Sequence, residues 1–386
     1  MFTVKTLNHI SPACRKILES GYTLSDNAAN PDAIFVRATD MHQYEFNKEL
    51  CCIARAGIGI NNIPVERCTD EGIVVFNTPG GNANGVKELF LFALNMASRD
   101  LLPAINWVYG YDNPDVPVEV AMEKIKKEFA GPEFGGKTIG VIGTGNVGSL
   151  VANICVDLGM RVLAYDPFLS VDAAWKISRY VERAPSLDMI YKECDYITLH
   201  APLTEETRNM VNADSISKMR DGVRIINLAR GGCVNEDDII SALESGKVAR
   251  FVADFPTERL IKAKNCILTP HLGGTTVESE EKCAVMAAEQ MADYLENGNI
   301  KNSVNLPTVF LERMGVCRLC VIHRNVPRMI NRFLDLVGDK NINVEHMINK
   351  PCGGVAYTII DVGEHIGDDV AEKIASMAEV MRVRVI

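Results

Sequence analysis

The glycine-rich segment between residues 138 and 148 constrains the fold more than any other part of the chain. An apolar run, Ile139–Ile142, leads into Gly143, Gly145 and Gly148, which have the spacing GxGxxG, and a helix-like segment, Ser149–Leu158, follows. Strand, glycine loop and helix in this order are typical of a dinucleotide-binding βαβ unit. The first glycine permits the tight turn, the second lets the backbone approach a pyrophosphate, and the third lets the helix pack on the strand. The helix N-terminus stabilises the anion.

Asp166 indicates which dinucleotide is bound. It lies 18 residues beyond Gly148, directly after the apolar segment Arg161–Tyr165. A carboxylate at this position accepts hydrogen bonds from the ribose hydroxyls and repels a 2′-phosphate. The next three residues, Pro167–Leu169, include no arginine or lysine. We therefore expect NAD rather than NADP; the alternative is a glycine turn in an α/β domain that binds no cofactor.

Short apolar segments alternate with helix-like ones from residue 33 to residue 271, which predicts βαβ units and parallel sheets. Most of the segments are continuously apolar, as expected for strands buried on both faces. The expected strands are Ala33–Val36, Cys52–Ala56, Val74–Asn77, Thr138–Ile142, Arg161–Tyr165, Tyr196–Leu199, Arg224–Asn227, Arg250–Ala253 and Cys266–Leu268.

Two long helical segments, Asn84–Arg99 and Val277–Asn297, bracket the nucleotide-binding unit and suggest that it is inserted in another domain. After a linker, the pattern changes to βαββαβ, which is of the ferredoxin-like type. We expect two doubly wound parallel-sheet domains of Rossmann or flavodoxin-like type and a small C-terminal domain. The predicted boundaries are 1–98 with 280–305 for substrate binding, 99–279 for NAD binding, and 315–386 for the C-terminal domain.

Composition excludes several function classes. The net charge is −10, from 40 basic and 50 acidic residues, which argues against nucleic-acid binding. No apolar run approaches the ~18 residues of a membrane helix, and the N-terminus lacks a signal-peptide pattern, so we expect a cytoplasmic protein. The 12 cysteines lack framework spacing and are expected to be reduced. Cys317 and Cys320 lie three apart on a predicted strand and therefore point to opposite faces, so we expect no metal site.

Polar residues follow three predicted strands, in the segments 227–232, 254–258 and 270–274. With these segments the chain resembles the D-isomer-specific 2-hydroxyacid dehydrogenases, whose arginine, glutamate and histidine fall on Arg230, Glu258 and His271. Further matches are Arg55-Ala56-Gly57-Ile58-Gly59, Asn77-Thr78-Pro79-Gly80 and His200-Ala201-Pro202-Leu203. The resemblance extends from Arg55 to Gly274.

The three residue types suit the oxidation of a 2-hydroxy acid, in which C2 loses a hydride and its hydroxyl a proton. His271 suits the proton, because an unperturbed imidazole titrates near neutrality. Glu258 would orient the ring and stabilise its charged form. Arg230 offers a planar, two-pronged donor to the substrate carboxylate.

The resemblance also implies further binding residues. The backbone amides of Gly57, Ile58 and Gly59 could form a nest for the same carboxylate, with Arg55 toward a substrate phosphate. Asp254 would lie on the nicotinamide side of the cofactor. The remaining expected cofactor contacts are Thr78, Asn146, Val147, Ala201, Leu228, Ala229, Arg230, His271, Gly273 and Gly274.

Among family members, the chain is most similar to those that oxidise D-3-phosphoglycerate to 3-phosphohydroxypyruvate, the first step of serine biosynthesis. The alternatives are a dehydrogenase for hydroxypyruvate, glyoxylate or lactate, and, in another class, an NAD-sensing binding protein. Three departures from the family pattern concern substrate choice: Asn61 replaces a usual aspartate, Ala201 a threonine and Arg259 a proline.

The C-terminal segment resembles an ACT domain, a small-molecule sensor. The resemblance places His323, Asn325 and Asn343 where relatives contact serine, but Arg328 replaces a glycine of that pattern. Serine binding and a purely structural, subunit-pairing role are the two alternatives. The helix at 84–99 is apolar on more than one face, which indicates a surface buried against another subunit. The resemblance also implies dimers, so we expect a homodimer or homotetramer.

Overall fold

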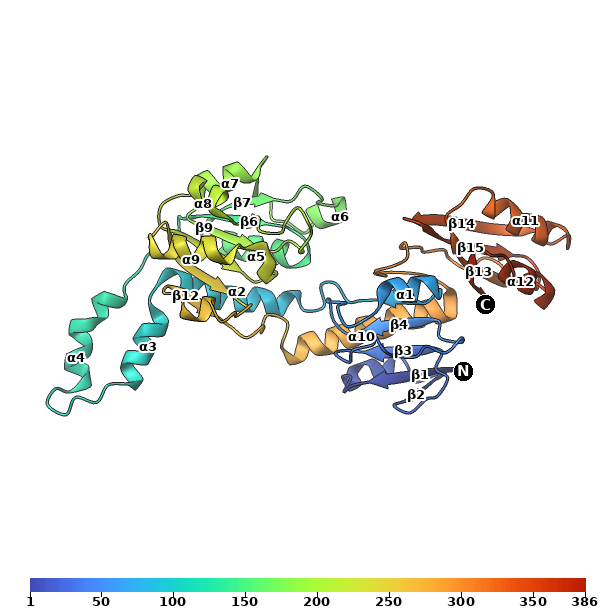
Figure 1. The fold of residues 1–386 in the computed structure, drawn as a ribbon, viewed down its shortest axis with the longest axis horizontal. Helices are drawn as coiled ribbons and strands as arrows, with labels where there is room; N and C mark the ends of the chain where they lie inside the picture. The colour runs from blue at the N-terminus through green and yellow to red at the C-terminus, as the bar shows by residue number, and fades with distance from the viewer. The chain divides into compact units, whose positions relative to one another are not determined.

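The alternation of apolar and helical segments produces two parallel β-sheets, and an antiparallel sheet follows residue 315 (Figure 1). The computed structural model describes residues 1–386, apart from the side chain of Asp172. Contacts divide the chain into unit 1, Met1–Gly81 with Glu280–Ile386, and unit 2, Asn82–Ser279. Within the described part of the chain, no helix is long and apolar enough to span a membrane.

The first sheet lies in unit 1 and has five parallel strands in the order β2-β1-β3-β4-β5. Its central strand β3 is buried at all four residues, as the continuously apolar sequence predicts. One short helix, α1 (Val65–Asp70), joins β4 to β5. The strands are β1 (Phe2–Leu7), β2 (Tyr22–Ser25), β3 (Ala33–Val36), β4 (Cys52–Arg55) and β5 (Val74–Phe76).

The second sheet lies in unit 2 and has seven parallel strands in the order β12-β11-β10-β9-β6-β7-β8. Successive strands are added from β6 outward to β8 on one side, and from β9 outward to β12 on the other. This is the doubly wound order, and the direction of strand addition reverses between β6 and β9. The strands are β6 (Thr138–Ile142), β7 (Arg161–Tyr165), β8 (Glu182–Arg183), β9 (Tyr196–Leu199), β10 (Val223–Asn227), β11 (Val248–Ala253) and β12 (Cys266–Leu268). The connecting helices are α5 (Asn146–Asp157), α6 (Val171–Ala174), α7 (Leu187–Glu193), α8 (Ala213–Lys218) and α9 (Glu236–Glu244).

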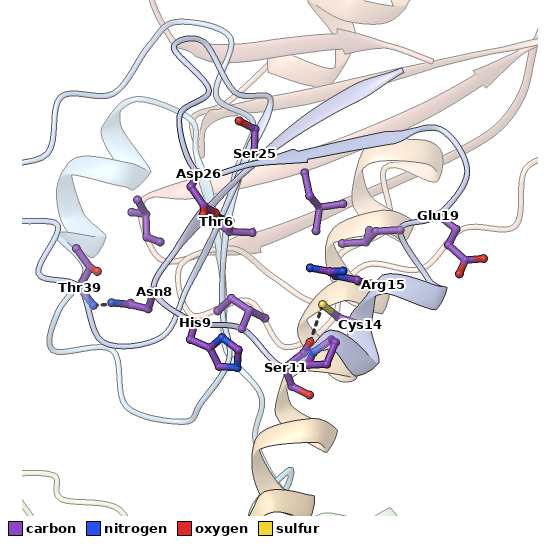
Figure 2. A pocket seen from close by; sticks show the side chains of 15 residues that line it. Thr6, Asn8, His9, Ser11, Cys14, Arg15, Glu19, Ser25, Asp26 and Thr39 are labelled. Atoms are coloured by element: carbon purple, nitrogen blue, oxygen red, sulfur yellow. Dashed lines mark hydrogen bonds between the residues drawn. The ribbon is translucent and has the colours of Figure 1, made fainter.

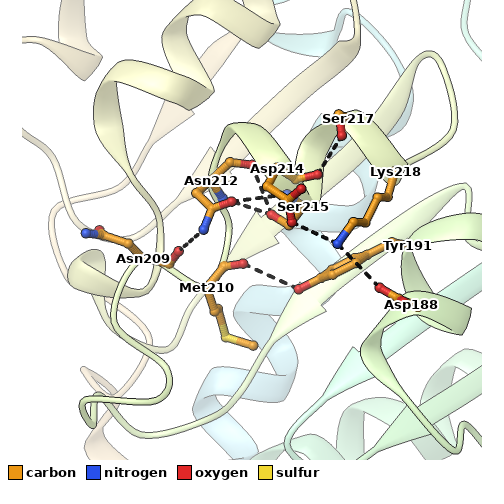
Figure 3. Close-up of polar contacts among 9 residues, drawn as sticks. All are labelled: Asp188, Tyr191, Asn209, Met210, Asn212, Asp214, Ser215, Ser217 and Lys218. Atoms are coloured by element: carbon orange, nitrogen blue, oxygen red, sulfur yellow. Dashed lines mark hydrogen bonds and ion pairs between the residues drawn. The ribbon is translucent and has the colours of Figure 1, made fainter.

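A capping box fixes the segment that leads from β9 to α8 (Figure 3). The Asn212 side chain accepts a hydrogen bond from the Ser215 amide at 3.1 Å, and the Ser215 hydroxyl accepts one from the Asn212 amide at 2.9 Å. Lys218 closes the cluster through Asp214 at 2.8 Å and Asp188 at 3.8 Å. These contacts are internal to the α7–α8 region and anchor the far end of the loop that begins at His200.

Helix α2 (Ala83–Ser98) corrects the predicted domain boundary at residue 98. It belongs to unit 2, and its Phe90, Leu94 and Ala97 share a buried cluster with Ile139 and Val141 of β6. The compact units therefore divide at Gly81–Asn82, because the apolar face of α2 completes the core of the second sheet. The contact division ends unit 2 at Ser279, within the long helix α10 (Val277–Asn297).

Two helices that the sequence analysis missed follow α2. They are α3 (Leu101–Tyr109) and α4 (Val118–Ile125), and neither contains a buried residue. Figure 1 shows them as a two-helix arm of unit 2. Their apolar residues are exposed instead, among them Ile105 at 46%, Val108 at 55% and Val120 at 50%. Most apolar residues of α2 are buried in unit 2, so the exposed apolar surface that was expected on residues 84–99 lies mainly on α3 and α4.

The C-terminal region has the predicted βαββαβ order and an antiparallel sheet, β14-β15-β13-β16. Cys317 and Cys320 of β13 lie in different buried clusters, as expected for opposite faces of a strand. The contact division groups this region with unit 1. Its elements are β13 (Cys317–Arg324), α11 (Met329–Gly338), β14 (Val344–Cys352), β15 (Val355–Val362), α12 (Asp368–Ala375) and β16 (Val380–Val385).

The C-terminal sheet holds the end of α10. Arg384 donates to the carbonyls of Tyr294 and Leu295 at 2.8 and 2.6 Å, and its guanidinium lies 4.6 Å from the centre of the Tyr294 ring. Arg318 donates to the Asn297 carbonyl at 2.6 Å, and the Tyr357 hydroxyl donates to the carbonyl of the next residue. Carbonyls in the last turn of a helix lack partners within it, and cations there interact favourably with the helix dipole.

Candidate active site

All predicted cofactor and catalytic residues of unit 2 lie at one edge of its sheet. They follow the carboxyl ends of β6, β7, β9, β10, β11 and β12. The carboxyl ends of parallel strands share an edge, and α/β sheets bind ligands there, at the point where the strand order reverses.

The glycine loop has the geometry that a dinucleotide requires. Gly143 has φ +85°, and a Cβ there would lie 2.8 Å from the Ala201 amide nitrogen. A Cβ on Gly148 would lie 1.9 Å from the Gly143 carbonyl oxygen, so only glycine permits this packing. By contrast, no atom lies within 4 Å of a Cβ built on Gly145, the residue that precedes α5, so a phosphate can reach the backbone. The loop fits a pyrophosphate.

Asp166 is held at the mouth of a cavity of about 490 Å³. Its carboxylate accepts hydrogen bonds from the amides of Thr144 at 2.8 Å and Phe168 at 2.9 Å, which ties the glycine loop to the end of β7. Arg183 of β8 lines the same cavity. This arginine was not predicted, because it lies 17 residues beyond Asp166 on a strand of only two residues.

Asn227 shapes the turn that carries Arg230. Its side-chain oxygen accepts a hydrogen bond from the Ala229 amide at 3.1 Å, and its amide group donates to the Arg230 carbonyl at 2.9 Å. Leu228 and Ala229 are buried, whereas Arg230 is exposed and donates to the Ala229 carbonyl at 2.7 Å. Asn227 was not predicted as a site residue; an asparagine at the end of an apolar strand was the available signal.

Asp254 organises the segment that carries His271. The carboxylate, which is 1% exposed, accepts hydrogen bonds from the Thr269 hydroxyl at 2.5 Å and from the amides of Leu272 and Gly273, each at 2.8 Å. The Asp254 carbonyl accepts one from the His271 amide at 3.1 Å. These partners account for both carboxylate oxygens, so the structure shows Asp254 as a support of this loop.

His271 is exposed and has φ +58°, the left-handed region that few residues other than glycine adopt. Its ring centre lies 5.1 Å from that of Phe255. Gly273 and Gly274 pack against the start of α2: a Cβ on Gly274 would lie 2.5 Å from the Asn82 amide nitrogen. The conformation of the loop is thus fixed by Asp254 on one side and α2 on the other.

Glu258 lies on the loop after β11 and is exposed. Among the described side chains, no hydrogen bond joins Glu258 to His271, so the expected orienting contact stays a prediction. Arg259, one of the departures from the family pattern, forms an ion pair with Asp237 of α9. This pair directs Arg259 toward α9.

His200 supports the fold of unit 2. Its Nε2 lies 2.9 Å from the Thr198 hydroxyl, and its ring meets the Phe90 ring edge-on at 6.3 Å. Burial lowers the pKa of His200 to about 3, so the ring is neutral near pH 7 and cannot take up a proton there.

The residues predicted from unit 1 also lie together. The Arg55 side chain donates to Asn62 at 3.0 Å, and a Cβ on Gly57 would lie 2.5 Å from its Nη1. A Cβ on Gly59 would lie 3.8 Å from the same nitrogen. The Thr78 amide donates to the Gly57 carbonyl at 3.1 Å. A guanidinium beside a glycine-rich backbone segment can bind an anion.

The expected effector residues each have partners of their own within the C-terminal region. His323 is 2% exposed, and its ring nitrogens lie 2.9 Å from the Arg324 carbonyl and 2.8 Å from the Thr358 hydroxyl. Asn325 and Asn343 are exposed and donate to Gly353 and Glu345 at 3.3 and 2.9 Å. The ring of His323 is thus engaged within the C-terminal core, because the sheet buries the residue that the resemblance placed at a ligand.

Comparison with known proteins places these geometries in context. Residues 114–273 match the model of the D-isomer specific 2-hydroxyacid dehydrogenase, NAD binding domain family. The chain is 38% identical over 286 residues to the D-3-phosphoglycerate dehydrogenase of Synechocystis, covering 72% of this chain and 49% of that protein. It is 38% identical over 256 residues to the hydroxypyruvate reductase of Thermotoga maritima, covering 64% of this chain and 78% of that protein.

Among solved structures, the chain is similar to an NAD⁺-bound 3-phosphoglycerate dehydrogenase of Entamoeba histolytica. The TM-score is 0.60 and the identity 26%, with 80% of this chain and 99% of that chain covered. The chain spans about half the length of the Synechocystis enzyme, 49%, and of its Archaeoglobus fulgidus counterpart, 52%.

Proposed function

Because the chain belongs to the D-isomer-specific 2-hydroxyacid dehydrogenase family, we propose that it oxidises D-3-phosphoglycerate to 3-phosphohydroxypyruvate with NAD as cofactor. The observation that carries the reaction type is the gathering of Arg230, the Asp254–Glu258 loop and His271 beside the glycine loop at one sheet edge. This reaction is the entry step of serine biosynthesis, and the free thiols of all 12 cysteines fit a cytoplasmic setting.

Bound NAD supplies the hydride acceptor for C2 of the substrate. Gly145 and the amides that open α5 would hold its pyrophosphate, and Asp166 would accept hydrogen bonds from its ribose hydroxyls. Arg230 binds the substrate carboxylate. A ring nitrogen of His271 takes the hydroxyl proton as the carbonyl forms, and Glu258 stabilises the resulting imidazolium.

The choice of a phosphorylated substrate rests on Arg55. Its guanidinium lies against the Gly57–Gly59 backbone, where one cation and several amides can share an anionic group. The curated relatives named D-3-phosphoglycerate dehydrogenase favour the same substrate, whereas the Thermotoga relative is named hydroxypyruvate reductase. Hydroxypyruvate is therefore the main competitor, and glyoxylate and lactate are weaker ones.

The experiment is an NADH absorbance assay in the direction of keto-acid reduction. Phosphohydroxypyruvate should exceed hydroxypyruvate, glyoxylate and pyruvate in kcat/KM by at least about a hundredfold, which is roughly 2.7 kcal/mol. Arg55→Gln should remove most of this preference and leave hydroxypyruvate turnover nearly unchanged. Equal kcat/KM for the two substrates in the wild type would assign the chain to hydroxypyruvate instead.

His271 is tested separately from substrate choice. His271→Ala should abolish turnover while NADH still binds, as measured by the fluorescence of the bound nucleotide. Turnover near the wild-type rate would refute the proton role. Tight NADH binding by the wild type without turnover of any of these acids would favour an NAD-sensing protein.

The C-terminal region is proposed to be an ACT domain. Its support is the βαββαβ order and the ferredoxin-like arrangement of its sheet. A serine site would have to form at the exposed Asn325 and Asn343, because His323 is engaged in the core. Serine should then inhibit the wild type and not Asn325→Ala; equal insensitivity of both would leave a structural, subunit-pairing role.

The arm formed by α3 and α4 is the proposed subunit contact. Its exposed apolar residues form a surface that a homo-oligomer, a dimer or tetramer, would bury. Val108→Asp with Val120→Asp should lower the mass measured by sedimentation. Val171→Asp is the matched control, because Val171 is 74% exposed on another helix of unit 2. A monomeric wild type would overturn this proposal.

A further inference from the structure

A large cavity in unit 1 lies outside the residues assigned so far (Figure 2). Its volume is about 950 Å³, at the upper end of the roughly 300–1,000 Å³ of small-molecule sites. Its lining comes from β1 and β2, from the loops that follow them, and from Thr39 beyond β3. The loop from Arg55 to Gly59 follows β4 and does not line it.

The position of the cavity in the sheet is that of a ligand site. In the order β2-β1-β3-β4-β5, the chain leaves β1 toward β2 and returns to β3 on the other side of β1. Loops diverge where the strand order reverses, and open α/β sheets bind ligands in the crevice that results. The cavity lies at the carboxyl ends of these strands.

One wall of the crevice is built around Asn8. This residue has φ +81°, and its side-chain oxygen accepts hydrogen bonds from the amides of Ala38 at 3.0 Å and Thr39 at 2.9 Å. The contacts join the loop after β1 to the loop after β3. The wall is therefore fixed before any ligand arrives, which lowers the entropy that binding loses.

The charged side chains of the lining have both signs. The cation is Arg15, which follows β1, and the anions are Glu19, which lies beyond it, and Asp26, which follows β2; the imidazole of His9 also lines the cavity. Asp26 accepts a hydrogen bond from the Thr6 hydroxyl. Among the described residues, no hydrogen bond or ion pair engages the side chains of His9, Arg15 or Glu19. Unpaired side chains of opposite charge around one cavity fit a zwitterionic ligand, which has one positive and one negative group.

The floor of the cavity is apolar and chemically inert. Leu7, Ile10, Leu18 and Leu24 contribute to it, and Leu18 is 2% exposed. The Cys14 thiol donates to the Ser11 carbonyl at 3.1 Å, and burial raises the pKa of Cys14, so it stays protonated.

We propose that this cavity binds an α-amino acid with a large apolar side chain. The carboxylate would pair with Arg15, the ammonium group with Glu19, and the side chain would cover the leucines of the floor. The proposal concerns unit 1 alone and does not depend on the proposed dehydrogenase activity.

Calorimetric titration of the full chain with L-leucine, L-methionine and L-phenylalanine tests it. We expect binding with a dissociation constant below about 1 mM and at least tenfold weaker binding of glycine and serine, which lack the apolar group. 4-Methylpentanoate, which lacks the ammonium group, and 3-methylbutylamine, which lacks the carboxylate, should each bind at least tenfold more weakly than leucine.

Variants locate the site. Arg15→Gln and Glu19→Gln should each weaken leucine binding at least tenfold, since each removes one charge-assisted contact. Lys16→Gln is the matched control: Lys16 is exposed beside Arg15 and does not line the cavity, so affinity should not change. Thermal unfolding of each variant verifies that it is folded.

Three results would overturn the proposal. They are no heat of binding with any of the amino acids up to about 10 mM, equal affinity for leucine and 4-methylpentanoate, or wild-type affinity in Arg15→Gln. Equal affinity for the two ligands would identify an anion site instead. Unchanged affinity in Arg15→Gln would place the amino acid elsewhere.

Discussion

The carbonyl oxygen of Asp254 accepts the amide hydrogen of His271, at 3.1 Å, while the carboxylate of the same aspartate holds the residues on either side. Asp254, the residue directly after β11, thereby fixes the left-handed backbone of His271, which is proposed to transfer the proton. The pair explains how a histidine can be exposed and still be held in one backbone conformation.

Asp254→Asn should lower kcat by about a hundredfold. The side-chain NH₂ of the asparagine would face a backbone N–H group that now donates to the carboxylate, and a displacement of the His271 loop by about 1 Å suffices for such a loss. Steady-state assays give the rate, and amide hydrogen exchange over residues 269–274 should show lost protection. Asp221→Asn is the control, since its side chain is 92% exposed and bonds only Lys247. Full activity with unchanged exchange would refute the positioning role.

Asp166→Ser should relax the preference for NAD. The serine keeps a hydrogen-bonding group for the Thr144 amide but removes the charge that repels a 2′-phosphate, and Arg183 then lines the cavity without a facing carboxylate. We expect the ratio of kcat/KM for NADH over NADPH to fall at least tenfold, or about 1.4 kcal/mol. An unchanged ratio would remove Asp166 from cofactor choice.

The neutral, half-buried His200 predicts acid sensitivity. Its pKa is about 3 in the folded chain, while in the unfolded chain it should be near 6.5. Between these values the unfolded state binds the extra proton, so the free energy of unfolding falls as pH decreases below about 6.5, by up to ~1.4 kcal/mol per pH unit. Denaturant titrations of the wild type and His200→Gln at pH 7 and 5 measure this loss. An equal change in the free energy of unfolding between the two pH values in both proteins would contradict the low pKa of His200.

Arg318 and Asp361 form a fully buried ion pair with contacts of 2.6 and 2.7 Å. Burial favours the neutral acid, yet the hydrogen bonds from Arg318 and the Met314 amide hold the pKa of Asp361 below its usual value. Arg318→Met should lower the free energy of unfolding by about 3–5 kcal/mol, because it strands a buried carboxylate. Adding Asp361→Leu should restore part of this loss.

The exposed pair Arg332–Glu379, at 2.9 Å, provides the matched control for this measurement. Arg332→Met should change the free energy of unfolding by less than about 1 kcal/mol. A double variant no more stable than Arg318→Met alone would contradict the buried-charge explanation.

Arg328 occupies a glycine conformation, with φ +72° at the start of α11. Left-handed backbone costs an ordinary residue about 1 kcal/mol. Arg328→Gly should therefore stabilise the C-terminal region by up to about 1 kcal/mol, whereas Arg328→Ala should not. Chemical denaturation measures both, and a less stable glycine variant would refute the strain.

Within the two parallel sheets, the sequence predicted the strands that are buried on both faces and missed those that are not. Ala33–Val36 and Thr138–Ile142 have the predicted bounds, because continuous apolar runs between turn residues specify them locally. Strand β1 alternates polar and apolar residues, and β8 is two residues long, so neither has such a run. The arm of α3 and α4 buries nothing and leaves no core pattern to detect.

The candidate site shows the same division. Gly143, Gly148 and Asp166 follow from one local motif, and the structure joins the glycine loop to Asp166 through the Thr144 amide. The engagement of His323 depends on Thr358, which is 35 residues away in the sequence, and the support of His271 depends on Asp254. Such contacts arise from the pairing of strands, so inspection of either segment alone does not predict them.

The carbonyls at the end of α10 also bear on how a chain of this kind can change in evolution. Because Arg318, Tyr357 and Arg384 supply their partners, a gene that lost the last seventy or so codons would expose these carbonyls to water and uncover the apolar residues beside them. Gain or loss of the C-terminal region in evolution should therefore be accompanied by polar substitutions on the face of α10 that this sheet covers.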